Sequence, residues 1–259
     1  MMYLRLTFLF ISISIFAQES IETSFIKNIS IDADTIIGID NFKTLFYTRN
    51  NVFYKKTNNN TSNYSNLQLG NIYSVNTFNS LKTNIFYKDF NTAIILDNRL
   101  AEIYKIDFNN LQPYKNVSRI TTGPDNTLWV FNQDLQQLEL YDYKANITRI
   151  KTLPTTSKVL DLKSDYNYCY LLTLNHLYIY NYFGSLISKH KNSGYTALAT
   201  YNENIILKKE NTLYYLKKGN KDVMPISINK NLINQFFVTN ETLYIYHNKN
   251  LQQFQLKIN

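Results

Sequence analysis

A paired-strand pattern recurs along this chain, and its period constrains the fold more than any other feature. Each copy is a short apolar run, a polar turn, and a second run that begins apolar and carries aromatic residues. The second runs begin at Val52, Leu100, Leu138, Leu177, Leu213 and Leu251. Their separations of 48, 38, 39, 36 and 38 residues match β-propeller blades of about 40 residues and about four strands.

The sequence therefore predicts an all-β chain folded as a β-propeller of about six blades, with five or seven blades left open. One repeat makes a sheet too small to bury both of its faces, so it must stack on its neighbours. The long first interval holds an extra apolar run at residues 84–87, which belongs either to a lengthened hairpin or to another blade. A two-layer β-sandwich with coincidental spacing is the alternative fold.

The two ends of the chain fit a closed ring. The last repeat stops near Ile258, after its second or third strand, and a spare strand-like segment runs from Ile21 to Ile29. We predict that this N-terminal strand completes the last blade, which would leave only short edges. No long helical pattern and no linker interrupts the chain, so residues 19–259 are predicted to form a single domain.

Residues 1–18 have the layout of a secretory signal peptide. Arg5 precedes an apolar run of 11 residues, and the small residue Ala17, followed by Gln18, marks the expected cleavage site. The run is too short to cross a bilayer core of about 30 Å, and no Cys follows it for lipid attachment. We therefore expect a periplasmic or secreted protein whose mature chain has no transmembrane segment; a buried first strand is the alternative.

The formal charge of +8 raises the question of a nucleic-acid or anionic partner. The lysines are spread along the chain, and the only dense group is Lys208, Lys209, Lys217, Lys218 and Lys221. Lysines on exposed strand edges discourage aggregation, and no nucleic-acid motif accompanies them. We predict no nucleic-acid partner.

No set of residues forms a recognisable catalytic or metal site. The histidines, His176, His190 and His247, are expected in turns and a polar loop, and Cys169 is expected as a buried apolar residue. The Asp32-x-Asp34 pair lacks the rest of a calcium loop. The sequence therefore predicts no catalytic residues, no metal site and no cofactor.

One turn carries residues typical of protein interfaces. Phe90 is an aromatic residue between the polar Asp89 and Asn91, and Arg99 follows a few residues later. Aromatic and Arg side chains are favoured interface anchors, so these four residues are the predicted protein-binding residues. The alternative is that Phe90 folds back onto its own hairpin.

Two segments carry a resemblance to known families. Residues 123–130, Gly-Pro-Asp-Asn-Thr-Leu-Trp-Val, and the later turn at 182–187 resemble elements of NHL-like and related sensor or lyase propellers. Residues 86–100 resemble a group of exported propellers of Bacteroidota, where some envelope proteins act with the type IX secretion translocon. The resemblance implies a propeller fold and an envelope partner, such as an outer-membrane translocon.

The sequence is consistent with two functions. The first is a non-catalytic protein-binding scaffold in the cell envelope, as a plug or accessory subunit of a type IX secretion translocon if the resemblance holds. The alternative is a propeller lyase or hydrolase that acts on periplasmic polysaccharide or another small ligand. That enzyme would need two or more carboxylates, or a His and a carboxylate, to converge at the central channel, since glycosidic acid/base pairs lie about 5–10 Å apart. The candidates are Asp89, Asp125, Asp165 and His176.

Overall fold

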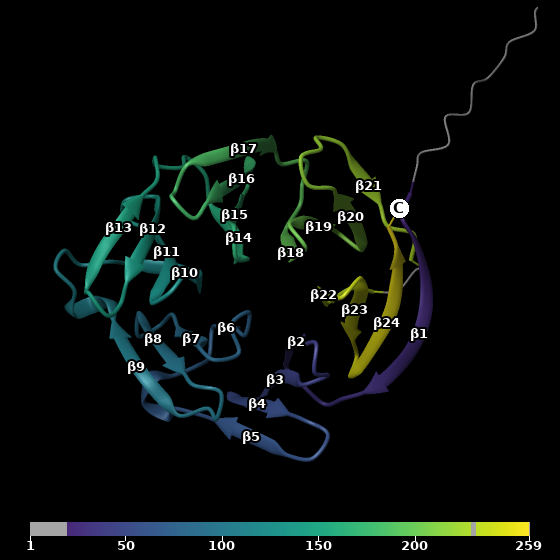
Figure 1. Cartoon of the computed structure of the whole chain (residues 1–259), viewed down its shortest axis with the longest axis horizontal. Coiled ribbons are helices and arrows are strands. Elements are labelled where there is room, and N and C mark those ends of the chain that lie inside the picture. Colours follow the sequence, from purple (N-terminus) through teal and green to yellow (C-terminus); the bar gives the residue numbers. More distant parts are fainter. Residues whose placement is uncertain (1–19, 229–231, 259) are drawn as a thin grey trace, which may run out of the picture.

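The computed structural model describes residues 20–228 and 232–258, which form six four-stranded antiparallel sheets arranged as blades around one axis (Figure 1). The innermost strands surround the axis and the outermost strands form the rim. The predicted six-bladed, all-β propeller is therefore confirmed, and the sandwich alternative is wrong. The expected signal peptide and its cleavage site at Ala17 and Gln18 lie outside the described residues.

In each of the first three blades, the strands follow one another from the axis outward in chain order. Blade 1 contains β2 (Thr35–Ile39), β3 (Leu45–Arg49), β4 (Val52–Lys56) and β5 (Thr61–Tyr64). Blade 2 contains β6 (Ser74–Asn76), β7 (Thr83–Tyr87), β8 (Thr92–Leu96) and β9 (Glu102–Asp107). Blade 3 contains β10 (Val117–Thr122), β11 (Thr127–Asn132), β12 (Gln137–Asp142) and β13 (Ile147–Lys151).

The remaining blades follow the same order until the last one. Blade 4 contains β14 (Val159–Ser164), β15 (Tyr168–Thr173), β16 (His176–Asn181) and β17 (Leu186–Lys191). Blade 5 contains β18 (Ala197–Tyr201), β19 (Asn204–Lys209), β20 (Thr212–Leu216) and β21 (Val223–Pro225). Blade 6 contains β22 (Gln235–Thr239), β23 (Thr242–His247), β24 (Asn250–Lys257) and β1 (Glu22–Ser30). Two short 3-10 helices, η1 (Leu67–Leu69) and η2 (Phe108–Asn110), lie between blades.

The ring is closed by the N-terminal strand. In Figure 1, β1 runs along the rim beside β24, and the two strands pair in antiparallel register from Glu22 with Lys257 to Ser30 with Asn250. Ile21 also forms a parallel bridge to Ile226, which ties this strand to the end of blade 5. The predicted closure by the N-terminal strand is confirmed.

The prediction for the second repeat is wrong by one strand. The run that begins at Leu100 leads into the outer strand, β9, and not into the third strand, which is β8; the extra run at 84–87 lies in the second strand, β7. Asp97 accepts hydrogen bonds from the Arg99 and Ala101 amides in the 97–101 turn, as Asn181 does from the Phe183 and Ser185 amides in the third-to-outer turn of blade 4. The third strands begin at Val52, Thr92, Gln137, His176, Thr212 and Asn250, so the true spacing varies between 36 and 45 residues.

The apolar core lies between neighbouring blades. Trp129 and Cys169 are both buried in one cluster between blades 3 and 4. For Cys169 this confirms the prediction from the sequence. Burial raises the pKa of the Cys169 thiol well above its usual value, so this thiol is protonated at neutral pH and acts as a small apolar group. Each interface of this kind fixes one blade against the next.

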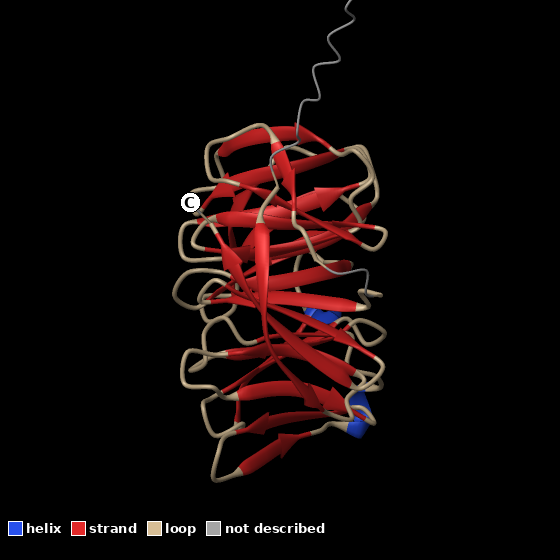
Figure 2. Cartoon of the chain, turned by 90° about the vertical axis from the view of Figure 1, so that its right-hand side faces the viewer, coloured by secondary structure: helices blue, strands red, loops and turns tan. Residues whose placement is uncertain are grey.

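The turns fall on two faces of the ring, because successive strands in each blade run in opposite directions (Figure 2). The turn face carries the turns between first and second strands and those between third and outer strands. The linker face carries the turns between second and third strands and the segments that link one blade to the next. Strands of five or six residues separate the two faces by roughly 17–20 Å.

Gly123 is required where the Gly-Pro-Asp turn enters β11. A Cβ here would lie 2.3 Å from Thr127 Oγ1 and 2.8 Å from Leu140 Cδ1, so neighbouring atoms would have to move. We expect Gly123→Ala to lower the free energy of unfolding by about 1–3 kcal/mol, measured by urea denaturation. Gly38→Ala is the control, since its Cβ would lie 4.0 Å from the nearest atom, Thr77 Oγ1. Equal midpoints for the two variants would contradict this account of the turn.

Candidate functional site

Three loops over blades 2 and 3 expose large apolar side chains on the linker face. Phe90 lies in the β7–β8 turn and is 49% exposed, Tyr114 lies in the linker to blade 3 and is 51% exposed, and Leu135 lies in the β11–β12 turn and is 48% exposed. We call these three residues the linker-face patch. Further exposed apolar residues on loops of the same face are Leu67, Leu153 and Leu174. A patch of exposed apolar side chains is typical of a protein-binding surface, and the turn face exposes further apolar side chains, among them Phe42 and Tyr166.

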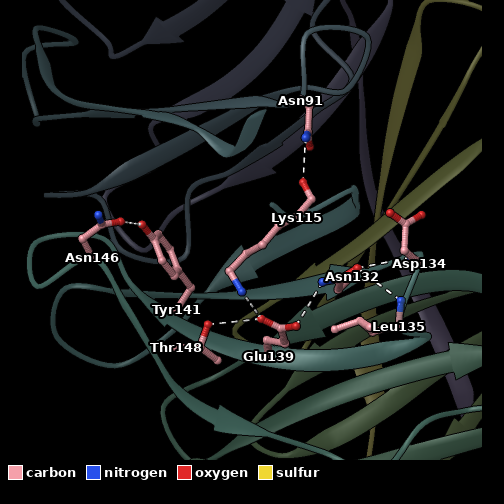
Figure 3. A network of polar contacts seen from close by, with 9 residues as sticks. All are labelled: Asn91, Lys115, Asn132, Asp134, Leu135, Glu139, Tyr141, Asn146 and Thr148. Carbon is pink, nitrogen blue, oxygen red and sulfur yellow. Dashed lines mark hydrogen bonds and ion pairs between the residues drawn. The ribbon is translucent and has the colours of Figure 1, made fainter. Parts of the chain in front are cut away.

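A buried ion pair lies beneath these loops. Figure 3 shows the Lys115 side chain, from the linker between blades 2 and 3, reaching Glu139 on β12. The two side chains are 3% and 0% exposed. Glu139 also accepts hydrogen bonds from Asn132 Nδ2 at 3.1 Å and from Thr148 Oγ1 at 3.2 Å. A buried ion pair persists when further hydrogen bonds satisfy its remaining polar atoms, and both carboxylate oxygens of Glu139 have such partners.

Two asparagines extend this network into the exposed loops. Asn91 Nδ2 donates to the Lys115 carbonyl at 2.7 Å, and its Oδ1 accepts from the Val117 amide at 3.0 Å. Asn132 Oδ1 accepts from the amides of Asp134 at 3.2 Å and Leu135 at 3.3 Å. The loops that carry Phe90, Tyr114 and Leu135 are therefore joined through one buried network, which lowers the entropy lost when a partner orders them.

The four predicted protein-binding residues do not form one surface. Asp89 and Phe90 are exposed on the linker face, whereas Asn91 is buried and acts as the cross-link described above. Arg99 lies in the β8–β9 turn on the opposite face, at the other end of β8. The ring of Phe90 lies beside the backbone of Gly70, because a Cβ there would be 3.2 Å from Phe90 Cε2. Phe90 thus covers the linker after blade 1, and does not simply fold onto its own hairpin.

The four candidates for an enzyme site are divided between the two faces. Asp89 and His176 lie on the linker face, while Asp125 and Asp165 lie in turns between first and second strands on the turn face. Asp165 has a local role: its Oδ1 accepts from the Asn167 and Tyr168 amides and its Oδ2 from the Tyr170 hydroxyl at 2.6 Å. The four candidates therefore do not converge as one group, and only the pairs Asp89 and His176, and Asp125 and Asp165, share a face.

The mouth of the central channel on the turn face forms a cavity of about 640 Å³. Its aromatic side chains include Phe78 and Tyr166, whose ring centroids are 4.6 Å apart. Glu203 also lines it, and hydrogen bonds from Lys218 and then Asn167 lower the pKa of its carboxyl. Glu203 is therefore ionised at neutral pH, which suits an ion-pair partner better than a general acid.

The other polar candidates have structural positions. His190 lies on the outer strand β17, so its predicted location in a loop is wrong. Asp34 Oδ2 accepts from the Asn50 amide at 2.7 Å, and Asp32 pairs with Lys249 at 2.8 Å. Within residues 20–228 and 232–258, no group of three or more His, Cys, Asp or Glu residues could hold a metal ion.

Four residues of the site were not predicted from the sequence: Tyr114, Leu135, Lys115 and Glu139. Glu139 carried a usable signal, because it is a single carboxylate inside the apolar strand run Leu138 to Tyr141. A charge in such a run must be paired if both sides of the strand are buried. The partner could not be read in the same way, since Lys115 lies in a polar linker that resembles any exposed loop.

No protein-family model and no curated protein sequence matches the chain. Solved structures share its fold at low identity. An inactive variant of virginiamycin B lyase from Staphylococcus aureus, solved with quinupristin, has a TM-score of 0.61 and 14% identity over 85% of this chain and 80% of that chain. The WD40 domain of Pan2 from Neurospora crassa has a TM-score of 0.60 and 6% identity over 88% and 76%. A chain of a mitotic checkpoint complex has a TM-score of 0.59 and 9% identity over 98% of both chains.

These structures establish the propeller fold and nothing finer, because one fold hosts many functions. They include both a lyase and a chain that belongs to a protein complex. Neither of the short helices that the structure describes is long and apolar enough to cross a membrane.

Proposed function

We propose that this chain is a non-catalytic scaffold of the cell envelope that binds a protein partner through the linker-face patch. The observation that carries the proposal is the set of three exposed apolar side chains, Phe90, Tyr114 and Leu135, on loops joined by one buried network. Side chains held in place before binding give more affinity than mobile ones. Support for the non-catalytic form is limited to one placement: Asp89 and His176 lie on the face opposite Asp125 and Asp165, so these four candidates do not form one catalytic group.

The compartment and the partner class within this proposal come from the sequence. The first 18 residues have the pattern of an export signal, and residues 86–100 resemble exported propellers of Bacteroidota. The partner is therefore an envelope protein, and a type IX secretion translocon in the outer membrane is the specific candidate. A plug or accessory subunit of such a channel would need a rigid face of this kind.

The triple variant Phe90→Ser/Tyr114→Ser/Leu135→Ser tests the proposal by affinity capture from envelope extracts. Buried aromatic anchors each contribute about 2 kcal/mol or more to binding, so we expect capture of the partner to fall at least tenfold. A photocrosslinking residue placed at position 90 should label the same partner.

The matched control is Phe42→Ser/Tyr166→Ser/Phe183→Ser, which removes three exposed aromatic side chains from the turn face. This variant should capture the partner as the unmodified protein does. The proposal is wrong if the linker-face variant captures the partner normally, or if the unmodified protein recovers no stoichiometric partner from envelope extracts.

A further inference from the structure

A largely apolar groove of about 280 Å³ opens between blades 4 and 5 near the rim. Its walls carry apolar side chains from the strands of the two blades: Tyr168, Tyr170, Ile179, Ile187, Ile205 and Leu216. The volume lies just below the range for drug-sized small-molecule sites, about 300–1,000 Å³. The groove therefore has room for one narrow apolar chain.

The groove is open because the outer strand of blade 5 is short. β21 has three residues, Val223–Pro225, whereas the outer strands of the other blades have between four and nine residues. The preceding segment, residues 217–222, forms an irregular turn in place of further strand, with Gly219 at a φ of 77°. In blade 5, a polar turn therefore lies at the edge of the groove, where the other blades have a longer outer strand.

This turn makes the edge of the groove basic. Lys217, Lys218 and Lys221 all line it, and they belong to the only dense lysine group in the sequence. One carboxylate, Glu203, lines the same groove and pairs with Lys218. Among the residues that line the groove, three lysines and one carboxylate leave a net positive charge at this edge, while Asp165 also acts on Lys218 from nearby.

His190 completes the opposite edge from β17. Burial, and then the charge of Lys221, lower the pKa of its imidazole, so the ring is neutral at pH 7. Its Nε2 lies 3.2 Å from Ser188 Oγ. The imidazole of His190 and the hydroxyl of Ser188 are hydrogen-bonding groups on the edge opposite the lysines. Neither group carries a negative charge that would offset the lysines.

We propose that the groove between blades 4 and 5 binds an anionic amphiphile, with its acyl chain along the apolar wall and its anionic head at the lysines of residues 217–221. The apolar lining selects a hydrocarbon chain, and the basic edge selects a negative head over a neutral or positive one. The groove lies towards the turn face, because the β20–β21 turn is there, so this site is separate from the linker-face patch.

Titration calorimetry with a series of straight-chain carboxylates, below their micelle concentrations, tests the proposal. Affinity should rise about fourfold for each added methylene until the groove is full, which corresponds to about 0.8 kcal/mol per buried methylene. The carboxylate should bind more tightly than the alcohol of equal length, and the alcohol more tightly than the trimethylammonium compound.

The variant Lys217→Glu/Lys221→Glu should weaken carboxylate binding at least tenfold. Lys105→Glu/Lys151→Glu is the matched control, since it changes the net charge equally on exposed outer strands of blades 2 and 3 and should bind like the unmodified protein. A second variant, Ser188→Trp, should block the groove and reduce affinity for the chain while its far-UV circular dichroism stays unchanged.

Two sources of the amphiphile give different results in vesicle sedimentation. Sedimentation with anionic but not zwitterionic vesicles, lost in Lys217→Glu/Lys221→Glu, indicates a lipid; carboxylate binding without sedimentation indicates a free amphiphile. The proposal is overturned if affinity does not depend on chain length, if acetate or inorganic phosphate binds equally well, or if neither carboxylates nor vesicles bind. Because the linker-face patch is untouched, partner capture by these variants should remain normal.

Discussion

Removing residues 20–30 is expected to eliminate most of the stability of the ring. Without β1, the edge of β24 loses its hydrogen-bonded partner, and the buried side chains of Leu251, Phe254 and Leu256 lose cover. Ile21 is also lost from the core between blades 5 and 6. Exposing one such side chain costs about 1.5–3 kcal/mol, so the loss at several positions approaches the whole stability of a typical domain, about 5–15 kcal/mol.

The fluorescence of Trp129 in guanidinium chloride measures this effect, because Trp129 is the single Trp and lies buried in blade 3, remote from the deletion. The control is a chain that lacks only residues 1–19. A synthetic peptide of residues 20–30 added to the deletion variant should restore cooperative unfolding, whereas a scrambled peptide should not. An unfolding midpoint equal to that of the control would disprove closure by β1.

Lys115→Met is expected to lower the free energy of unfolding by about 3–5 kcal/mol, because it leaves the fully buried Glu139 carboxylate without its counter-charge. Replacing both partners, as Lys115→Met/Glu139→Leu, should restore part of this loss, since no buried charge then remains unpaired. Urea denaturation of both single variants and the double variant gives the coupling between the two positions.

The control for this cycle is Lys218→Met, which removes an ion pair whose lysine is largely exposed. Exposed pairs contribute little, so its urea midpoint should barely move. If the changes in the free energy of unfolding of Lys115→Met and Glu139→Leu add up to that of the double variant, the coupling is contradicted.

Lys115→Met should also weaken partner capture by more than the loss of folded protein explains, since Lys115 joins the loops of Phe90 and Leu135.

The blade count and the ring closure could be predicted from the sequence, because each depends on the order and spacing of apolar runs. The second repeat could not be placed correctly, since the Asp97 turn and the Lys88–Asn91 turn have similar chemistry and only the pairing of β7 with β8 distinguishes them. That pairing is set by packing against blades 1 and 3, which no local pattern records.

The candidate site was predicted in part. Phe90 carried a local signal, an aromatic residue among polar ones in a turn. Tyr114 and Leu135 share a face with Phe90 only because the blades are arranged in a ring, and this arrangement places turns that are distant in the sequence on one face. The prediction that Arg99 and Phe90 lie on one surface was wrong. Their turns lie at opposite ends of the single strand β8, and therefore on opposite faces of the ring.

The pairing of β1 with β24 also sets the order of events during synthesis. β1 leaves the ribosome before every other described strand, and β24 leaves after all of them. Blades 1 to 5 can form one after another as their hairpins emerge, but β1 must wait through the translation of roughly 220 residues for its neighbour. Until then β1 lacks its hydrogen-bonded neighbour, and a chaperone that binds an extended segment carrying Ile21, Phe25 and Ile29 would find its substrate in residues 21–30.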